Sequence, residues 1–260
     1  MQKPPIAPDD YIAGLAKGLA VLESFDTERQ RLNASQAAQK AGITRAAARR
    51  HLLTLAHLGY LETADGFFWL SPKVLKFSGS YMASARLPRT VQPTLNQLCA
   101  QTGHSFSVVV REGSEVIIVA RCTAPSVAGE RLLPHGMHLG SRLPVHATST
   151  GRVLLAALPP DDLHDWLRHH SLPRLTANTL TDQQQLLETI AQVRKDDYSM
   201  AAEEHELGVL ALAVPLRNMA GHTLAALNVV TSPRRIDADT LRQQLLPLLQ
   251  DAARQLRSQL

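Results

Sequence analysis

Apolar residues recur with a helical period through the first sixty positions and with a strand period directly after them. A spacing of three to four residues predicts helices over residues 11–25, 35–40 and 45–57. Two short apolar runs then flank an Ala-Asp-Gly turn at 64–66, which is a strong hairpin signal. Three helices followed by a hairpin predict a winged helix-turn-helix over residues 11–71.

The helix boundaries in this segment are marked by capping and turn residues. Ser35 can cap the middle helix, which we expect to end near Lys40. Gly42 supplies the sharp turn between the two helices. Thr44 is a second capping residue, so the basic helix is expected to begin at Arg45.

The outer side of this basic helix carries arginines around a small alanine. Small side chains let a helix lie deep in a major groove, where guanidinium groups reach phosphates or guanine edges. A basic helix face is often only solvated, but a basic face, a capped start and a wing together favour DNA binding. The residues expected at the DNA interface are Ser35, Thr44, Arg45, Ala46, Arg49, Arg50 and Thr54.

The charge distribution supports the same interpretation. The 260 residues are enough for two domains with separate cores. Residues 1–89 hold twelve Lys and Arg against seven Asp and Glu, a net charge of +5. The other residues hold fifteen against sixteen, a net charge of −1. The basic excess therefore coincides with the helix-turn-helix, as an electrostatic footprint for DNA requires.

The residues before and after the helix-turn-helix predict a disordered N-terminus, a helical linker and a second domain. Residues 1–10 are proline-rich and polar, and we expect disorder there. Residues 72–90 have the pattern of an amphipathic helical linker, a kind of segment that commonly mediates dimerisation. Strand pairs with a period of two are expected within 105–120 and 210–230, with helices between and after them. Residues 91–260 thus predict an α+β domain, an antiparallel sheet covered by helices.

Cysteine usage and hydropathy indicate the compartment. Cys99 and Cys122 are the only cysteines, and neither stands in a metal-ligand spacing. The N-terminus has no apolar region typical of a signal peptide, so we expect a reduced, cytoplasmic protein. No apolar run approaches the length of a membrane span.

Two other classes of function compete with regulation. An enzyme could use Ser149, His146 and Glu203 as nucleophile, base and orienting group, but Ser149 lies in no G-x-S-x-G elbow and His146 is only three residues away. A metal-dependent protein would draw on residues whose spacing fits no common zinc signature, namely His135, His138, His146, Glu203, Glu204 and His205. We therefore expect no catalytic residues, no metal site and no cofactor besides a small organic acid.

Four long segments resemble transcription regulators of the IclR family, and together they extend over essentially the whole chain. They are GLAKGLAVLESF (14–25), TRAAARRHLLTLAHLGYLE (44–62), GSRLPVHATSTGRVLLAALP (140–159) and AAEEHELGVLALAVPLRNMAGHTLAALNVV (201–230). The resemblance implies a homodimer or tetramer that binds a double-stranded operator, responds to an effector and can act on RNA polymerase. The GSRLP and ATSTGRVLLA segments are most similar to the PcaR/PobR branch, which regulates aromatic-acid catabolism.

A candidate effector site lies at the start of the predicted helix 149–158. Ala147-Thr148-Ser149-Thr150 precedes an apolar run, which by itself can be an ordinary helix cap, but the free amides of such a helix N-terminus can also accept a carboxylate. Arg142 just upstream can pair with a carboxylate or be solvated, as an arginine in a loop more often is, and His146 can hydrogen-bond the ligand or serve only in packing. The resemblance implies the same amides, the 201–211 segment and the strand around Asn228. The candidate residues are Arg142, His146, Thr148, Ser149, Thr150, Glu203, Asn228 and Val230.

The chain departs from one pattern in the family. Acetate-operon regulators carry an acid, a cysteine and a serine where this sequence has Ala201, Ala211 and Val230. Loss of three polar contacts argues against glyoxylate or pyruvate and favours a flatter aromatic acid, such as 4-hydroxybenzoate, protocatechuate or terephthalate. The expected function is a ligand-responsive regulator of a catabolic operon, and an aliphatic acid or a metal as its effector is the alternative.

Overall fold

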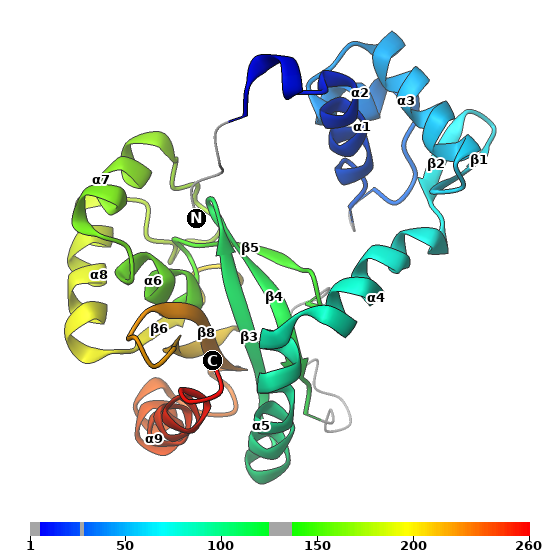
Figure 1. The fold of residues 1–260 in the computed structure, drawn as a ribbon. Coiled ribbons are helices and arrows are strands. Elements are labelled where there is room, and N and C mark those ends of the chain that lie inside the picture. Colours follow the sequence, from blue (N-terminus) through cyan, green and yellow to red (C-terminus); the bar gives the residue numbers. More distant parts are fainter. Residues whose placement is uncertain (1–5, 27–28, 125–136) are drawn as a thin grey trace. The chain divides into compact units, whose positions relative to one another are not determined.

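The chain divides between Ser84 and Ala85 into two units, each with its own core (Figure 1). The computed structural model describes residues 6–26, 29–124 and 137–260. The division falls inside the predicted linker 72–90, whose residues are shared between the two units. The first unit contains the predicted helix-turn-helix and the second contains the predicted α+β domain, so the expected fold class is confirmed.

The first unit is a three-helix bundle with a hairpin. Its core is formed by Val21, Phe25, Leu32, Ala37, Leu52, Leu61 and Phe68. Its elements are α1 (Ala13–Glu23), α2 (Ala34–Ala41), α3 (Arg45–His57), β1 (Leu61–Ala64), β2 (Phe67–Leu70), a 3₁₀ turn at Pro72–Val74 and α4 (Leu75–Ser84).

The start of α2 differs from the sequence prediction. Asn33, not Ser35, caps the helix: its Oδ1 accepts from the amides of Ser35 and Gln36, each at 3.0 Å. Gln36 Oε1 accepts from the Asn33 amide at 2.9 Å in return. This reciprocal capping box satisfies amides at both positions, so the helix begins earlier than Ser35 alone would allow. The prediction that Ser35 caps the helix was wrong.

The other boundaries of the first unit agree with the sequence pattern. Thr44 Oγ1 accepts from the Ala47 amide at 3.2 Å, and α3 begins at Arg45. Asp65 and Gly66 both have positive φ, 52° and 78°, as a tight type I′ hairpin turn requires. Disorder was predicted for residues 1–10, but Pro8–Asp10 form a 3₁₀ turn, because proline presets φ and two acids follow it in the first turn. Residues 1–5 lie outside the described residues.

One antiparallel sheet organises the second unit (Figure 1). Within the described residues six strands pair in the order β5-β4-β3-β8-β7-β6. Their bounds are β3 (Ser105–Glu112), β4 (Glu115–Cys122), β5 (Arg142–Pro144), β6 (Ser199–Ala202), β7 (Leu210–Arg217) and β8 (Thr223–Thr231). The edge strands β5 and β6 were not predicted, because three and four residues are too few to show a period.

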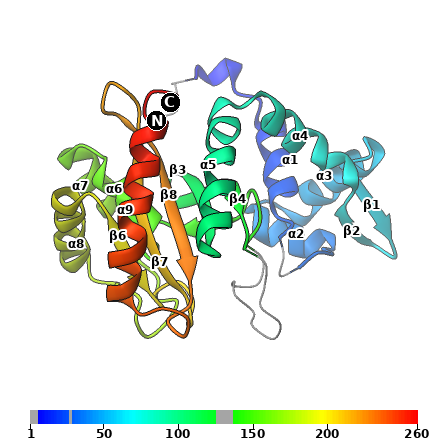
Figure 2. The same ribbon diagram turned by 90° about the horizontal axis from the view of Figure 1, so that it is seen from below.

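Helices cover both faces of this sheet (Figure 2). One face packs against α5 (Arg86–Thr102) and α9 (Ala238–Leu256), with Phe106, Leu212 and Leu227 in the core between them. The other face packs against α6 (Ser149–Ala156), with α7 (Pro160–His169) and α8 (Gln183–Asp196) outside it. In the described part of the chain, no helix is long and apolar enough to cross a membrane.

Candidate functional site

The outer side of α3 forms a basic surface on the first unit. Ala48 and Leu52 are fully buried, whereas Arg45, Ala46, Arg49 and Arg50 are exposed. Within the described residues, no ion pair involves any of these three arginines. Their guanidinium groups are therefore available to phosphates or base edges.

Two other predicted DNA residues, Ser35 and Thr54, lie on α2 and α3. Ser35 is exposed in the first turn of α2, and the hydroxyl of Thr54 donates to the carbonyl of Arg50 at 2.9 Å. A hollow between α1 and α3 is lined by Lys17, Arg50 and His51 together with Gly14, Ala47 and Thr54. Sequence reasoning missed Lys17, because only the packing of α1 on α3 brings it beside the arginines.

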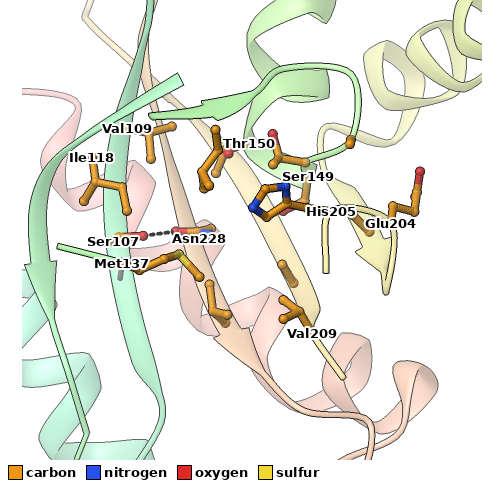
Figure 3. Close-up of a pocket in the computed structure, with 16 residues that line it drawn as sticks. Ser107, Val109, Ile118, Met137, Ser149, Thr150, Glu204, His205, Val209 and Asn228 are labelled. Carbon is orange, nitrogen blue, oxygen red and sulfur yellow. Dashed lines mark hydrogen bonds between the residues drawn. The ribbon is translucent and has the colours of Figure 1, made fainter. Parts of the chain in front are cut away.

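A pocket lies between α6 and the sheet in the second unit (Figure 3). The space between its lining residues, including open solvent at its mouth, is about 490 Å³. Most of its wall is apolar, with a few polar side chains. Its lining residues are Ser107, Val109, Ile118, Met137, Leu143, Ala147, Thr148, Ser149, Thr150, Ala201, Glu204, His205, Val209, Ala211, Asn228 and Val230.

The sheet contributes side chains to the pocket in two neighbouring rows. Ala201 on β6 pairs with Ala211 on β7, which pairs with Val230 on β8, so three apolar residues form one row. In the next row Asn228 pairs with Ser107 on β3, and the Ser107 hydroxyl donates to Asn228 Oδ1 at 2.5 Å. The three positions at which this chain departs from the acetate-operon regulators are thus neighbours on the face of the sheet that lines the pocket, and Asn228 lies in the adjacent row.

The N-terminus of α6 closes the pocket on the side opposite the sheet. Thr148 caps the helix: its Oγ1 accepts from the Gly151 amide and donates to the Pro144 carbonyl, both at 3.1 Å. The amides of Ser149 and Thr150 have no acceptor among the described residues. The Ser149 hydroxyl is also buried without a partner in the described residues. This helix end can therefore hold an anion.

A close approach of two backbone segments fixes the position of this helix end. A Cβ on Gly151 would lie 2.0 Å from the carbonyl oxygen of Val145 and 2.3 Å from its Cα. Backbone atoms cannot yield as a flexible side chain can. Glycine is therefore required at this position, although its φ is not in the left-handed region.

Gly151→Ala should destabilise the second unit by about 1–3 kcal/mol through overpacking and should displace the amides that face the pocket. Urea unfolding monitored by tryptophan fluorescence measures the change, since Trp166 lies in this unit. The matched control is Gly79→Ala in α4, where nothing lies within 4 Å of the added carbon. We expect that variant to be unchanged or slightly stabilised. Equal stabilities of the two variants and the wild type would contradict the requirement for glycine at position 151.

A buried ion pair lies behind the pocket wall. Arg152 on α6 donates from one guanidinium nitrogen to Glu204 Oε1 at 2.8 Å, and a second nitrogen contacts Oε2. The Arg152 side chain is 4% exposed and that of Glu204 is 12% exposed. Arg152 Nε donates to the His146 carbonyl, and the Thr179 hydroxyl donates to the Glu204 carbonyl. Because the pair is compensated, Glu204 does not make the pocket anionic.

Three of the predicted effector residues lie outside the pocket lining. Arg142, expected to be free for a carboxylate, pairs with Glu112 and Glu115 at 2.6 Å each, because β5 places it beside the β3–β4 hairpin. Glu203 has a φ of 56° and its carboxylate accepts from the Gly208 amide at 2.8 Å. These two expectations are corrected by the structure.

His146 has the packing role that the sequence left open. It is buried, and its Nε2 lies 3.0 Å from the Pro173 carbonyl oxygen. Burial lowers the pKa of its imidazole. The structure does bring together five of the eight candidates in the pocket lining, namely Thr148, Ser149, Thr150, Asn228 and Val230.

Sequence reasoning missed several pocket residues. Ser107 carries a local signal, a serine within an otherwise apolar strand, as Asn228 does in its own strand. Glu204 and His205 lie in the 201–211 segment that the resemblance implicates, but they were named individually only as possible metal ligands. Val109, Ile118, Leu143 and Val209 look like any other core positions. Among the described residues, no cluster of three His, Cys, Asp or Glu could hold a metal ion. His135 lies outside the described residues.

A winged helix with a basic recognition face, joined to a separate domain with a ligand pocket, defines a ligand-responsive DNA-binding regulator. Two family models match the chain: the IclR helix-turn-helix domain at residues 14–65 and the bacterial transcriptional regulator IclR C-terminal domain at residues 79–258. The chain belongs to the IclR family of transcriptional regulators. The predicted family is confirmed, as is the prediction of a regulator and not an enzyme.

Relatives of known function cover nearly the whole chain. The p-hydroxybenzoate hydroxylase transcriptional activator of Acinetobacter baylyi is 51% identical over 97% of this chain and 93% of its own length. The Pca operon regulatory protein of the same organism is 48% identical over 96% of this chain and 90% of its own length. The inducer-binding domain of an Acinetobacter PobR double mutant, solved with 3-hydroxybenzoic acid, is 47% identical. It covers 66% of this chain and 98% of its own, with a TM-score of 0.62.

Proposed function

We propose that this regulator senses a small aromatic carboxylic acid, such as 4-hydroxybenzoate, protocatechuate or terephthalate, and controls a catabolic operon. The observation that carries the proposal is the pocket at the N-terminus of α6. Its apolar walls fit an aromatic ring, and the free amides of Ser149 and Thr150 fit a carboxylate. The Ser107–Asn228 pair on the sheet offers a polar contact for a ring hydroxyl.

The relatives support the same ligand class. The two Acinetobacter proteins are named for p-hydroxybenzoate hydroxylase and for the Pca operon, and the related inducer-binding domain was solved with 3-hydroxybenzoic acid. An aliphatic acid is less well served by this pocket, because the row of Ala201, Ala211 and Val230 offers no side-chain hydrogen bond. The proposal requires no metal and no cofactor.

Binding of an aromatic acid should raise the melting temperature of the purified protein. At a ligand concentration one hundred times Kd the stabilisation is about 2.7 kcal/mol. For a protein of this size this corresponds to a shift of roughly 5–10 °C. A thermal-shift screen would compare 4-hydroxybenzoate, 3-hydroxybenzoate, protocatechuate and terephthalate with glyoxylate and pyruvate, with sodium acetate as the ionic control. A shift with glyoxylate or pyruvate alone would reverse the proposed ligand class.

The same proposal implies an oligomeric form, a palindromic operator and a contact with RNA polymerase. Two winged helices of a homodimer or tetramer would read the half-sites of a palindromic operator. The acid would change the relative populations of DNA-binding arrangements, and the bound regulator would act on RNA polymerase. Because the protein would act on operator DNA, we place it in the cytoplasm.

A further inference from the structure

Two polar atoms in the pocket are buried without a hydrogen-bond partner among the described residues. They are the hydroxyl of Ser149 and the Nδ1 of His205. Buried polar atoms are nearly always paired in folded proteins, and an exception calls for an explanation. In Figure 3 the His205 imidazole points into the pocket on the side of Ser149, whereas Ser107 and Asn228 lie on the opposite wall. A ligand at the α6 N-terminus could satisfy both atoms.

Among the described residues that line the pocket, none offers a free cation to a carboxylate. Of the described residues that line it, Glu204 alone carries a formal charge, and Arg152 already compensates that charge. Arg142 on β5 pairs with Glu112 and Glu115, and Arg121 donates to the Met137 carbonyl. The donors that the described residues offer to a bound carboxylate are therefore neutral: the two free amides, the Ser149 hydroxyl and the His205 ring.

The surroundings of His205 favour the neutral form of its ring. Burial lowers the pKa of the imidazole, and the neighbouring His146 lowers it further. A neutral imidazole carries one N–H donor and one acceptor, and a hydrogen-bond partner selects the tautomer. A carboxylate has only acceptors and therefore selects the tautomer that donates.

We propose that His205 is a specificity-determining residue of the effector pocket, which donates a hydrogen bond to the carboxylate held at the α6 N-terminus. This inference rests on the proposed function. With His205 as a donor, the two free amides, the Ser149 hydroxyl and the His205 ring can all donate at this end of the pocket. The two oxygens of a carboxylate can accept from all of these groups, whereas the NH₂ of a primary carboxamide finds no acceptor on the amides and is accepted only if Ser149 or His205 stops donating. The pocket should therefore select aromatic acids over carboxamides of the same shape.

The test compares the affinities of an acid and its carboxamide, measured by isothermal titration calorimetry on the full chain. The acid is the one that the wild-type protein binds most tightly among 4-hydroxybenzoate, 3-hydroxybenzoate and protocatechuate. We expect the wild type to prefer the acid at least 100-fold. His205→Phe should weaken acid binding roughly 10- to 100-fold and carboxamide binding less than 3-fold, so the preference falls. His205→Gln, which keeps an N–H donor, should retain more of the preference than His205→Phe.

The matched control is His104→Gln. His104 also has a buried Nδ1 without a partner among the described residues and a pKa lowered by burial, but it does not line the pocket. The His104→Gln variant should bind both the acid and its carboxamide with wild-type affinity. A preference that is the same in wild type and His205→Phe would overturn the role of His205 while the proposed function stands. If the wild type binds none of the acids, the proposed function fails and this inference fails with it.

Discussion

Arg152→Met should cost about 3–5 kcal/mol of stability, because it leaves the Glu204 carboxylate buried without its counter-charge. The change also removes the donor to the His146 carbonyl, which holds the loop before α6. We therefore expect loss of effector binding together with the loss of stability. Urea denaturation and calorimetric titration with the best-bound acid measure the two effects.

The control for this substitution is Arg168→Met. Arg168 pairs with Asp165, but both side chains are more than half exposed, and such pairs contribute little to stability. The double variant Arg152→Met with Glu204→Leu should recover much of the loss, since it removes both charges. A loss below about 1 kcal/mol in Arg152→Met would show that the pair is hydrated and not a structural element of the pocket.

Arg49→Ala combined with Arg50→Ala should weaken operator binding at least 100-fold. Each arginine that reaches a guanine edge contributes about 1–3 kcal/mol of discrimination, and the two positions lie on the exposed face of one helix. Fluorescence anisotropy on a duplex selected from a random-sequence library measures the affinity. A smaller salt dependence in the variant would identify phosphate contacts among those lost.

Effector affinity should be unchanged in this double variant, because α3 and the pocket belong to different units. Arg234→Ala, an exposed arginine of the second unit, is the matched control and should bind DNA as the wild type does. Full operator affinity in the Arg49/Arg50 variant would refute the assigned recognition face.

The sequence predicted those features whose cause is local. Thr44 caps α3 from within its own turn, and the Asp65-Gly66 hairpin depends on two adjacent residues. The Thr148 cap and the free amides after it are likewise local properties of one helix end. For this reason the sequence predicted the DNA-facing helix and the capped end of α6, whereas the binding role of that end was predicted from the family resemblance.

Features that depend on distant pairing were not predictable in the same way. Ser107 meets Asn228 across 121 positions of sequence, and Arg152 meets Glu204 across 52. Arg142 looked free because β5 is too short to show a period, so its acidic neighbours on the β3–β4 hairpin could not be inferred. The orientation of His205 depends on how its segment folds against α6, which no local pattern records.

The row formed by Ala201, Ala211 and Val230 has a consequence for how such regulators diverge. These side chains lie on one face of three paired strands, and the opposite face carries the core beneath α5 and α9. A substitution in the row therefore alters the chemistry offered to the ligand without changing backbone pairing or that core. Each single step can keep the protein above its folding threshold. A lineage can thus move from one inducer to another by short mutational paths, while the framework that positions α6 is inherited intact.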